Sequence, residues 1–347
     1  MSSAAVHARQ VRASIHGAPV ELTCALPSLA ERVDRLLRPF VVAELPEGFV
    51  PASGLVQPYD QDQVVRHLSP TALRVPSTEG LAELWQEGER FWLIDERVGL
   101  VEINFLKNQW RSWILPRPTA DEVRIVDLAV LWPMSQLLRS KGLFLLPAAS
   151  FVRAGWGVLM LAPFAVESEL RAVIRAGYRI VAQRWSALRE EEGRLEMLGF
   201  PGEVECCHTP HLRQAQAAAP QWADLTAQHI GCSQNHAFLD AALIAQPGRR
   251  GKAHLNELAP PRAVEALRAN WPLIDLHPTR RVAQLPMKLA QFARCCEIQL
   301  SRNTSDLLVL LDSLRYSRRV SFGPSAGPPP SVSLLRPLPA PAMGAAA

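Results

Sequence analysis

The sequence of 347 residues lacks an uninterrupted apolar run long enough to span a membrane. A transmembrane helix needs about 20 consecutive apolar residues. The longest candidate, Leu143–Leu161, is interrupted by Pro147, Ser150, Arg153 and Gly155. The N-terminal residues also lack the apolar segment of a secretory signal peptide. We therefore expect a cytoplasmic protein with no membrane partner, whose six cysteines are reduced.

Clustered positive charge is also missing. The formal net charge is only +4, and the lysines and arginines are spread along the chain. The densest group, Arg315, Arg318 and Arg319, is typical of a solvated helix end. No basic run is interleaved with aromatic residues, so we predict no nucleic-acid partner. The hydrophobic content of 48% and charged content of 20% predict a packed core.

The C-x-x-C pair of common zinc sites is absent, and the one G-x-S-x-G match, Gly323–Gly327, lies in the Pro-rich tail rather than at the strand-to-helix turn of a serine hydrolase. Scattered loop residues are the favoured interpretation of the Cys and His cluster between residues 206 and 236, although some of its spacings could bind zinc. Adjacent cysteines would point to opposite faces of a strand. We predict no metal and no cofactor. The metal-ligand candidates are Cys206, Cys207, His208, His211, His229, Cys232 and His236.

Local patterns predict a hairpin and a helix near the N-terminus. Val11–Ile15 and Val20–Thr23 flank a His-Gly turn, which indicates a β-hairpin. Ser28, followed three residues later by Glu31, predicts a capping box at the start of a helix. Residues 44–62 are rich in Pro, Gly, Asp and Gln and predict a loop.

The next segment predicts a strand meander and then a helix. Leu81–Gln86 indicates a short amphipathic turn or helix. Thr119 is the expected N-cap of a helix over Ala120–Ser140, which Pro133 should kink or divide. The three strands expected between them are Arg90–Asp95, Val101–Leu106 and Trp110–Leu115.

The stretch from Gly157 to Arg189 predicts strand, loop, helix and strand in that order. Val158–Leu161 and Tyr178–Val181 are the apolar runs, and Glu169–Arg175 is the helix between them. This is the unit that carries a phosphate-binding loop in P-loop proteins. Such a loop needs glycines, so that backbone N–H groups can surround phosphates, and then Lys and Ser/Thr. The corresponding loop here has no Gly and no Lys; it reads Ala162, Pro163, Phe164, Ala165, Val166, Glu167, Ser168.

The order of several pieces resembles the HPr serine kinase-related proteins of bacterial gene clusters, which are P-loop ATPases of the HPr kinase and phosphoenolpyruvate-carboxykinase type. The resemblance covers most of residues 11–315, and no single motif in it is diagnostic. It rests on LLRSKGLFLLPAASFVRAGWGVLMLAP, LRAVIRAGYRIVAQRW, GRLEMLGFPG, HLNELAPPRAVEALRANWP, LPMKLAQFARCCEIQLSRNTSDLLVLLDSL and the opening IHGAPVELTCALPSLAERVDRLLRPF.

The active positions that this resemblance implies are replaced in this chain. Pro147 stands where active relatives carry a His before the loop, and Glu167 stands where they carry the phosphate-binding Lys. Gln183 and Arg184 occupy the places of their acidic pair, while Ser168 is retained. Reversing the charge of the Lys about 4 Å from a polyanion changes the interaction by several kcal/mol. Losing the acidic pair removes metal ligands. Kinase chemistry at this position is therefore not expected.

The resemblance implies an α/β fold: an HPr kinase-like P-loop core with a mixed sheet, preceded by a smaller α+β region. We divide the chain into an N-terminal α+β region with a strand meander (1–117), a degenerate HPr kinase-like domain (118–315) and a disordered Pro/Ala-rich tail (316–347). Members of the family often form oligomers, which implies a homo-oligomer here.

The function that follows is that of a pseudoenzyme. It would bind a protein or peptide partner or regulate an active paralogue, in a gene cluster for peptide or protein modification as the resemblance implies. An enzyme is the alternative, either an ATP-dependent serine kinase or another transferase with a remodelled cleft. Such a cleft would use Glu167, Glu169 and Arg184, whereas a cleft plugged by Phe164 would favour the pseudoenzyme. A zinc-stabilised interaction domain is the third hypothesis.

Overall fold

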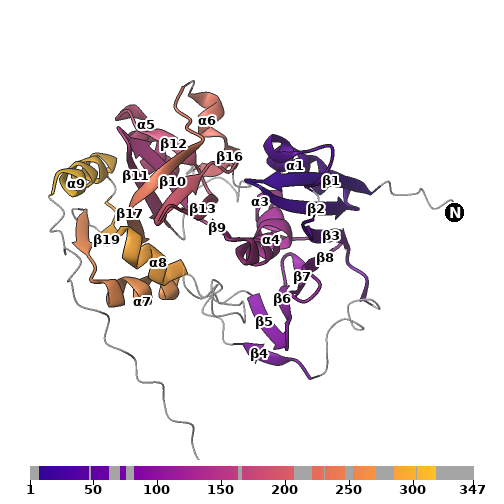
Figure 1. Ribbon diagram of the computed structural model, residues 1–347. Coiled ribbons are helices and arrows are strands. Elements are labelled where there is room, and N and C mark those ends of the chain that lie inside the picture. Colours follow the sequence, from indigo (N-terminus) through magenta and orange to yellow (C-terminus); the bar gives the residue numbers. More distant parts are fainter. Residues whose placement is uncertain are drawn as a thin grey trace, which may run out of the picture.

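Two large β-sheets form the protein in the computed structural model (Figure 1). The structure describes residues 8–46, 48–61, 71–75, 82–162, 166–206, 221–229, 231–246, 253–270, 285–301 and 303–317. The first sheet has the order β1-β2-β3-β8-β7-β6-β5-β4. Its strands are β1 Arg9–Ile15, β2 Ala18–Cys24, β3 Ala52–Pro58, β4 Leu73–Val75, β5 Ala82–Glu87, β6 Arg90–Asp95, β7 Gly99–Asn104 and β8 Gln109–Ile114.

The predicted N-terminal hairpin is confirmed. β1 and β2 pair antiparallel from Arg9↔Cys24 to Ile15↔Ala18. The turn places both His16 and Gly17 at positive φ, 47° and 89°, which is the geometry that tight hairpin turns require. Strand β3 then joins β2 and β8 in parallel, so the first sheet is mixed.

Helix α1 (Pro27–Leu37) packs on this sheet and is followed by the short 3₁₀ turn η1 (Arg38–Phe40). Leu29, Ala30, Val33 and Leu37 are buried, and their spacing gives the helix one apolar face. The helix begins earlier than the capping box predicted, because Pro27 occupies its first turn, where a missing N–H costs nothing. The N-cap is therefore Leu26 rather than Ser28.

A continuous helical segment lies between the two sheets (Figure 1). It comprises α3 (Glu122–Val126), the π-helical turn η2 (Asp127–Leu131), α4 (Trp132–Leu138) and the 3₁₀ turn η3 (Arg139–Lys141). The predicted helix over this region is therefore present, but its N-cap is Asp121, whose side chain accepts a hydrogen bond from the Arg124 N–H, rather than Thr119.

Pro133 explains how this segment is attached to the first sheet. In an α-helix the carbonyl of Ala129 would accept a hydrogen bond from the N–H of residue 133, and proline has none. Trp110 Nε1 and Ser112 Oγ supply donors instead, at 3.1 and 2.7 Å from the Ala129 oxygen. The π-helical turn at this point fits the same cause, because an interrupted hydrogen-bond ladder changes helix geometry locally.

Two predictions for the first sheet are wrong. Part of the stretch predicted as a loop is β3, and the stretch predicted as a helical turn is mostly β5, which pairs antiparallel with β6. Gly54 contributed to the loop prediction, yet it lies on β3 because of packing. A Cβ atom on Gly54 would lie 2.1 Å from Cζ2 of Trp110. Glycine here provides space for an indole ring, which no local pattern reveals.

This contact predicts that replacing Gly54 with alanine lowers the free energy of unfolding by about 2 kcal/mol, the usual cost of overpacking a well-packed core. Trp110 is buried and its Nε1 is hydrogen-bonded, so the indole cannot move away without losing that bond. Urea unfolding of G54A checks the prediction. The neighbouring substitution S53A, on the same strand, should change stability by less than about 0.5 kcal/mol. Equal stability of the two variants would contradict the interpretation.

The second sheet has nine strands in the described chain and is also mixed. Its main order is β12-β10-β11-β17-β14-β13-β9, and β19 pairs with both β17 and β18. The pairs β11–β17 and β17–β19 are parallel. The strands are β9 Leu143–Leu146, β10 Ala149–Arg153, β11 Trp156–Leu161, β12 Arg179–Ala182, β13 Ser186–Glu191, β14 Arg194–Leu198, β17 His236–Gln246, β18 His254–Glu257 and β19 Arg294–Gln299.

Helices cover both faces of the second sheet. Helices α7 (Pro260–Asn270) and α8 (Leu285–Phe292) pack on one face, and α5 (Glu167–Arg175) and α9 (Thr304–Tyr316) pack on the other. Strand β17 serves both cores, with Leu243 directed to the α5/α9 side and Ile244 to the α7/α8 side. A small hairpin of β15 (Val204–Cys206) and β16 (Gln221–Ala223) precedes the short helix α6 (Leu225–Gln228).

The two sheets share packed side chains. Leu143 and Leu145 of β9 belong to the core of the first sheet, whereas Phe144 and Leu146 pack in the α7/α8 core of the second. Phe40 stacks on Phe200 with ring centroids 5.5 Å apart. The observed class is thus mixed α/β, with helices on both faces of the second sheet. Of the predicted tail (316–347), Tyr316 is the last residue of α9 and Ser317 is its C-cap, so this tail begins in a helix; residues 318–347 lie outside the described residues.

Candidate functional site

The predicted unit of strand, loop, helix and strand is present as β11, α5 and β12. Its two strands are not neighbours, because β10 lies between them and pairs antiparallel with both. Of the loop, Ala162 and Val166 are described, whereas Pro163, Phe164 and Ala165 lie outside the described residues. Pro147, where the resemblance implies a His, is an exposed residue between β9 and β10.

The first turn of α5 carries carboxylates. Glu167 accepts a hydrogen bond of 2.7 Å from Arg171 Nε, one turn further along the helix. Glu169 is only 8% exposed and accepts from Ser168 Oγ at 2.7 Å. The Ser168 hydroxyl, which the resemblance implies at a phosphate site, is thus directed to a carboxylate. Negative charge at a helix N-terminus satisfies the helix dipole and disfavours a second anion there.

Gln183 stands where the resemblance implies the first acidic residue, and its amide group is fully hydrogen-bonded. Its Nε2 donates to the Gly202 carbonyl at 3.0 Å and to Asp224 Oδ1 at 2.6 Å, and its Oε1 accepts from the Leu225 N–H at 2.7 Å. The side chain is 4% exposed. Gln183 therefore joins β12 to the loop at residue 202 and to the start of α6.

Asp224 is the N-cap of α6. Its Oδ1 accepts from the N–H groups of Thr226 and Ala227, at 2.9 and 3.1 Å, as well as from Gln183. Burial acts to raise the pKa of Asp224, but the hydrogen bonds from Thr226, Gln183 and the backbone outweigh it and lower that pKa. Asp224 is therefore ionised at neutral pH.

Arg184, in the place of the second acidic residue, forms an ion pair with Asp127 of η2. The other oxygen of Asp127 accepts from Trp185 Nε1 at 3.1 Å. Burial, the largest influence, raises the pKa of Asp127 to about 6, and Arg184, Trp185 and Arg124 oppose it only in part. Asp127, Arg184 and Trp185 thus link the helical segment to the residues that follow β12 in the second sheet.

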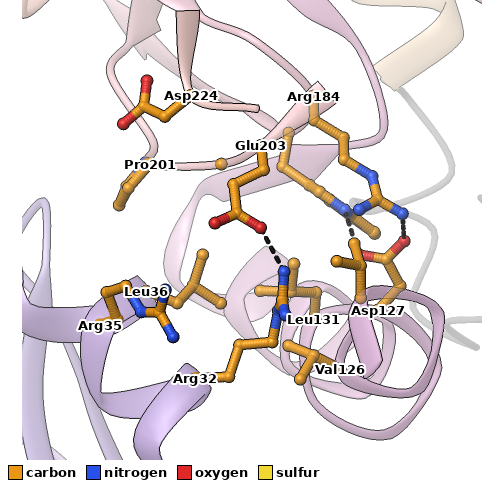
Figure 2. A pocket seen from close by; sticks show the side chains of 13 residues that line it. Arg32, Arg35, Leu36, Val126, Asp127, Leu131, Arg184, Pro201, Glu203 and Asp224 are labelled. Atoms are coloured by element: carbon orange, nitrogen blue, oxygen red, sulfur yellow. Dashed lines mark hydrogen bonds and ion pairs between the residues drawn. The ribbon is translucent and has the colours of Figure 1, made fainter. Parts of the chain in front are cut away.

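These side chains line a cleft between α1, the helical segment and the loop at residues 201–203 (Figure 2). Its volume is about 620 Å³, open solvent included. Arg32 of α1 reaches across it to pair with Glu203, and its Nη1 lies 3.3 Å from Glu122. The complete lining is Arg32, Arg35, Leu36, Val123, Val126, Asp127, Leu131, Arg184, Trp185, Pro201, Gly202, Glu203 and Asp224.

The sequence predicted only part of this constellation. Of the three polar residues expected in a remodelled cleft, Arg184 lines this one, whereas Glu167 and Glu169 do not. Sequence reasoning missed Arg32, Arg35 and Glu203, which carry no local signal of a site. Asp127 did carry a local signal of a site, because it is a lone charge in the apolar run between Val126 and Trp132.

The metal-ligand candidates are not gathered in the described chain. Cys207, His208 and His211 lie outside the described residues, and Cys206 is at the end of β15. Cys232 is buried beside the Leu225 carbonyl, and His236 Nδ1 lies 2.8 Å from Glu196 Oε1. His229 Nε2 is buried without a hydrogen-bond partner among the described residues. Within those residues, no group of three His, Cys, Asp or Glu side chains could hold a metal ion.

Comparisons with known proteins give little further guidance. No protein-family model matches the chain, and no curated protein matches it. Among solved structures, the Hpr(Ser) kinase/phosphatase from Coxiella burnetii is similar at 12% identity and a TM-score of 0.29, over 49% of this chain and 95% of that one. None of the described helices combines the length and apolar character needed to cross a bilayer.

Proposed function

We propose that this chain is a non-catalytic binding protein: an HPr kinase-like pseudoenzyme that holds a protein or peptide partner, or regulates an active paralogue. The proposal starts from the sequence resemblance and from the replaced residues at the positions it implies. One structural observation carries it furthest. Gln183 and Arg184, in place of the acidic pair, are committed to hydrogen bonds and an ion pair that hold neighbouring elements together.

Phosphoryl transfer needs cations and N–H donors around the γ-phosphate and carboxylates for its metal ion. The two side chains at the expected metal position offer an amide and a guanidinium, and neither is a Mg²⁺ ligand of the usual kind. The helix that would receive the phosphates begins with Glu167 and has Glu169 in its first turn. Together these features support binding without phosphoryl transfer as the retained role.

Calorimetric titration with ATP, with and without magnesium, tests the proposal. We expect the wild-type protein to bind ATP with a Kd weaker than about 1 mM. A variant with residues 162–168 rebuilt as a Gly-rich loop with Lys at position 167 should bind ATP measurably, because it restores donors and positive charge. E167K alone should gain less affinity for ATP than the rebuilt loop. E31K, at an exposed position on α1, is the control for the added positive charge.

Transfer of the γ-phosphate from ATP to the protein itself or to serine peptides is measured in parallel. Micromolar binding of MgATP by the wild type, or phosphate transfer that D127N abolishes, would overturn the proposal. It would favour the alternative, a transferase that uses the cleft. The raised pKa of Asp127 beside Arg184 is the observation that favours this alternative, because perturbed carboxyl groups in clefts often serve as acids or bases.

A further inference from the structure

The cleft between α1 and the loop at residues 201–203 is lined by both apolar and charged side chains. Leu36, Val123, Val126, Leu131 and the Trp185 ring supply apolar surface. Three arginines and three carboxylates also line the cleft, namely Arg32, Arg35, Arg184, Asp127, Glu203 and Asp224. This charge inventory is balanced when every carboxyl group is ionised, so the cleft as a whole favours neither a polyanion nor a polycation.

Most of these charges already have partners. Arg32 pairs with Glu203, and Arg184 pairs with Asp127, as Figure 2 shows. Arg35, in contrast, is exposed and forms no ion pair or hydrogen bond within the described part of the chain. Within the described residues, every hydrogen bond to Asp224 reaches its Oδ1, so its Oδ2 keeps its acceptor capacity toward that part of the chain. One cation and one carboxylate oxygen therefore remain available at the cleft.

These two groups lie on different walls. Arg35 projects from α1, and Asp224 lies beyond Pro201 at the start of α6 (Figure 2). A ligand that satisfies both must carry an anionic group and a cationic group at separate points. Leu36 and Pro201 also line the cleft, which favours an apolar body between the two charged groups of the ligand. A nucleotide fits this arrangement poorly, because its phosphates would approach Glu203 and Asp224 as well as the arginines.

We propose that this cleft binds a short peptide segment of a partner protein, with an acidic side chain at Arg35, a basic side chain at Asp224 and an apolar side chain between them. The inference rests on the proposed binding function and names its site. Each end forms a charge-assisted contact, and burial of the apolar side chain adds affinity. A peptide can place both charges and the apolar group in one order, which gives the site directional specificity.

The test uses capped synthetic peptides and calorimetry, with no nucleotide present. The probes are Asp-Leu-Lys, Asp-Leu-Leu-Lys and Asp-Leu-Leu-Leu-Lys, which vary the distance between the charges. The controls are the corresponding peptides with Asp at both ends or Lys at both ends. We expect at least one dipolar peptide to bind about tenfold more tightly than its like-charged controls. Absence of binding by every dipolar peptide would overturn the inference.

Substitutions locate the binding site. R35Q should weaken the best dipolar peptide about tenfold, whereas R38Q, an exposed arginine outside the cleft, should leave its affinity unchanged. D224N should also weaken binding while keeping α6 capped, because Asn and Asp cap helices about equally well. R35E should reverse the preference at that wall, so that the peptide with Lys at both ends becomes the tightest ligand. That gain cannot arise from unfolding.

The outcomes separate this inference from the proposed function. Equal effects of R35Q and R38Q would overturn the cleft as the peptide site. The proposed function would still be judged by the ATP titration, which uses a different ligand and different variants. Tight MgATP binding together with peptide binding at Arg35 would overturn the proposal that the chain is a pseudoenzyme. The peptide site would remain, as the site of a peptide substrate.

Discussion

Replacing Gln183 with leucine should lower the free energy of unfolding by about 3–4 kcal/mol, because it removes a buried amide that joins three segments. The Leu225 N–H loses its side-chain acceptor, Gln183 Oε1 at 2.7 Å. The Gly202 carbonyl and Asp224 Oδ1 lose a shared donor. A buried polar group left without a partner costs about 1–3 kcal/mol, which is why the loss exceeds that of one hydrogen bond. Urea unfolding of Q183L measures it.

The matched variant Q183E preserves shape and returns an acidic residue to this position. Its carboxylate can still accept from the Leu225 N–H, but it faces the Asp224 carboxylate and the Gly202 carbonyl, which need a donor. We expect Q183E to be less stable than wild type at pH 8 and to recover toward wild type at lower pH, as the new carboxyl group becomes protonated. Equal stability of Q183E and wild type at pH 8 would show that the donor at this position is dispensable.

The stability contributed by Asp127 should fall as pH rises from about 4 to about 7. Burial raises the pKa of Asp127 from 3.8 to about 6 in the folded protein. A carboxyl group with a raised folded-state pKa is protonated more readily in the folded state, so its contribution is fully present below pH 3.8 and is lost as pH rises through about 6. The difference of roughly two pH units corresponds to about 3 kcal/mol.

The difference in free energy of unfolding between wild type and D127N isolates this contribution. Asparagine keeps the acceptor for Trp185 Nε1 and does not titrate. The difference should decline by about 2.4 kcal/mol between pH 4 and pH 7 and then stay nearly constant. D121N removes a carboxylate from the cap of the same helical segment and should leave the decline in place. A difference that rises with pH would mean that the Arg184 ion pair outweighs burial.

Local sequence patterns predicted those elements whose cause is local. The His-Gly turn and its alternating flanks predicted the β1–β2 hairpin, which is confirmed. The apolar spacing of α1, and the order of β11, α5 and β12, were likewise readable because strand and helix periodicities repeat within a few residues. The caps were less predictable. Asp121 and Leu26, rather than Thr119 and Ser28, begin their helices, because several neighbouring residues could each have served.

The failures have a common cause in packing between distant segments. Gly54 looked like a loop residue, yet it lies on a central strand because Trp110 needs the space above it. Pro133 suggested a kink or a break, and the structure shows why the helix continues: Trp110 and Ser112 satisfy the carbonyl that the proline leaves free. Both explanations involve residues far apart in the sequence.

The sequence alone determined the chemistry at the expected phosphate position, since the identities at 162–168, 183 and 184 decide which charges and ligands are available. Only the tertiary structure decided where the charges meet. Arg35, Asp127, Arg184 and Asp224 come from α1, η2, the end of β12 and the cap of α6, and the packing of the two sheets brings them to one cleft. Side-chain convergence depends on strand order and on the shared core, which no window of neighbouring residues encodes.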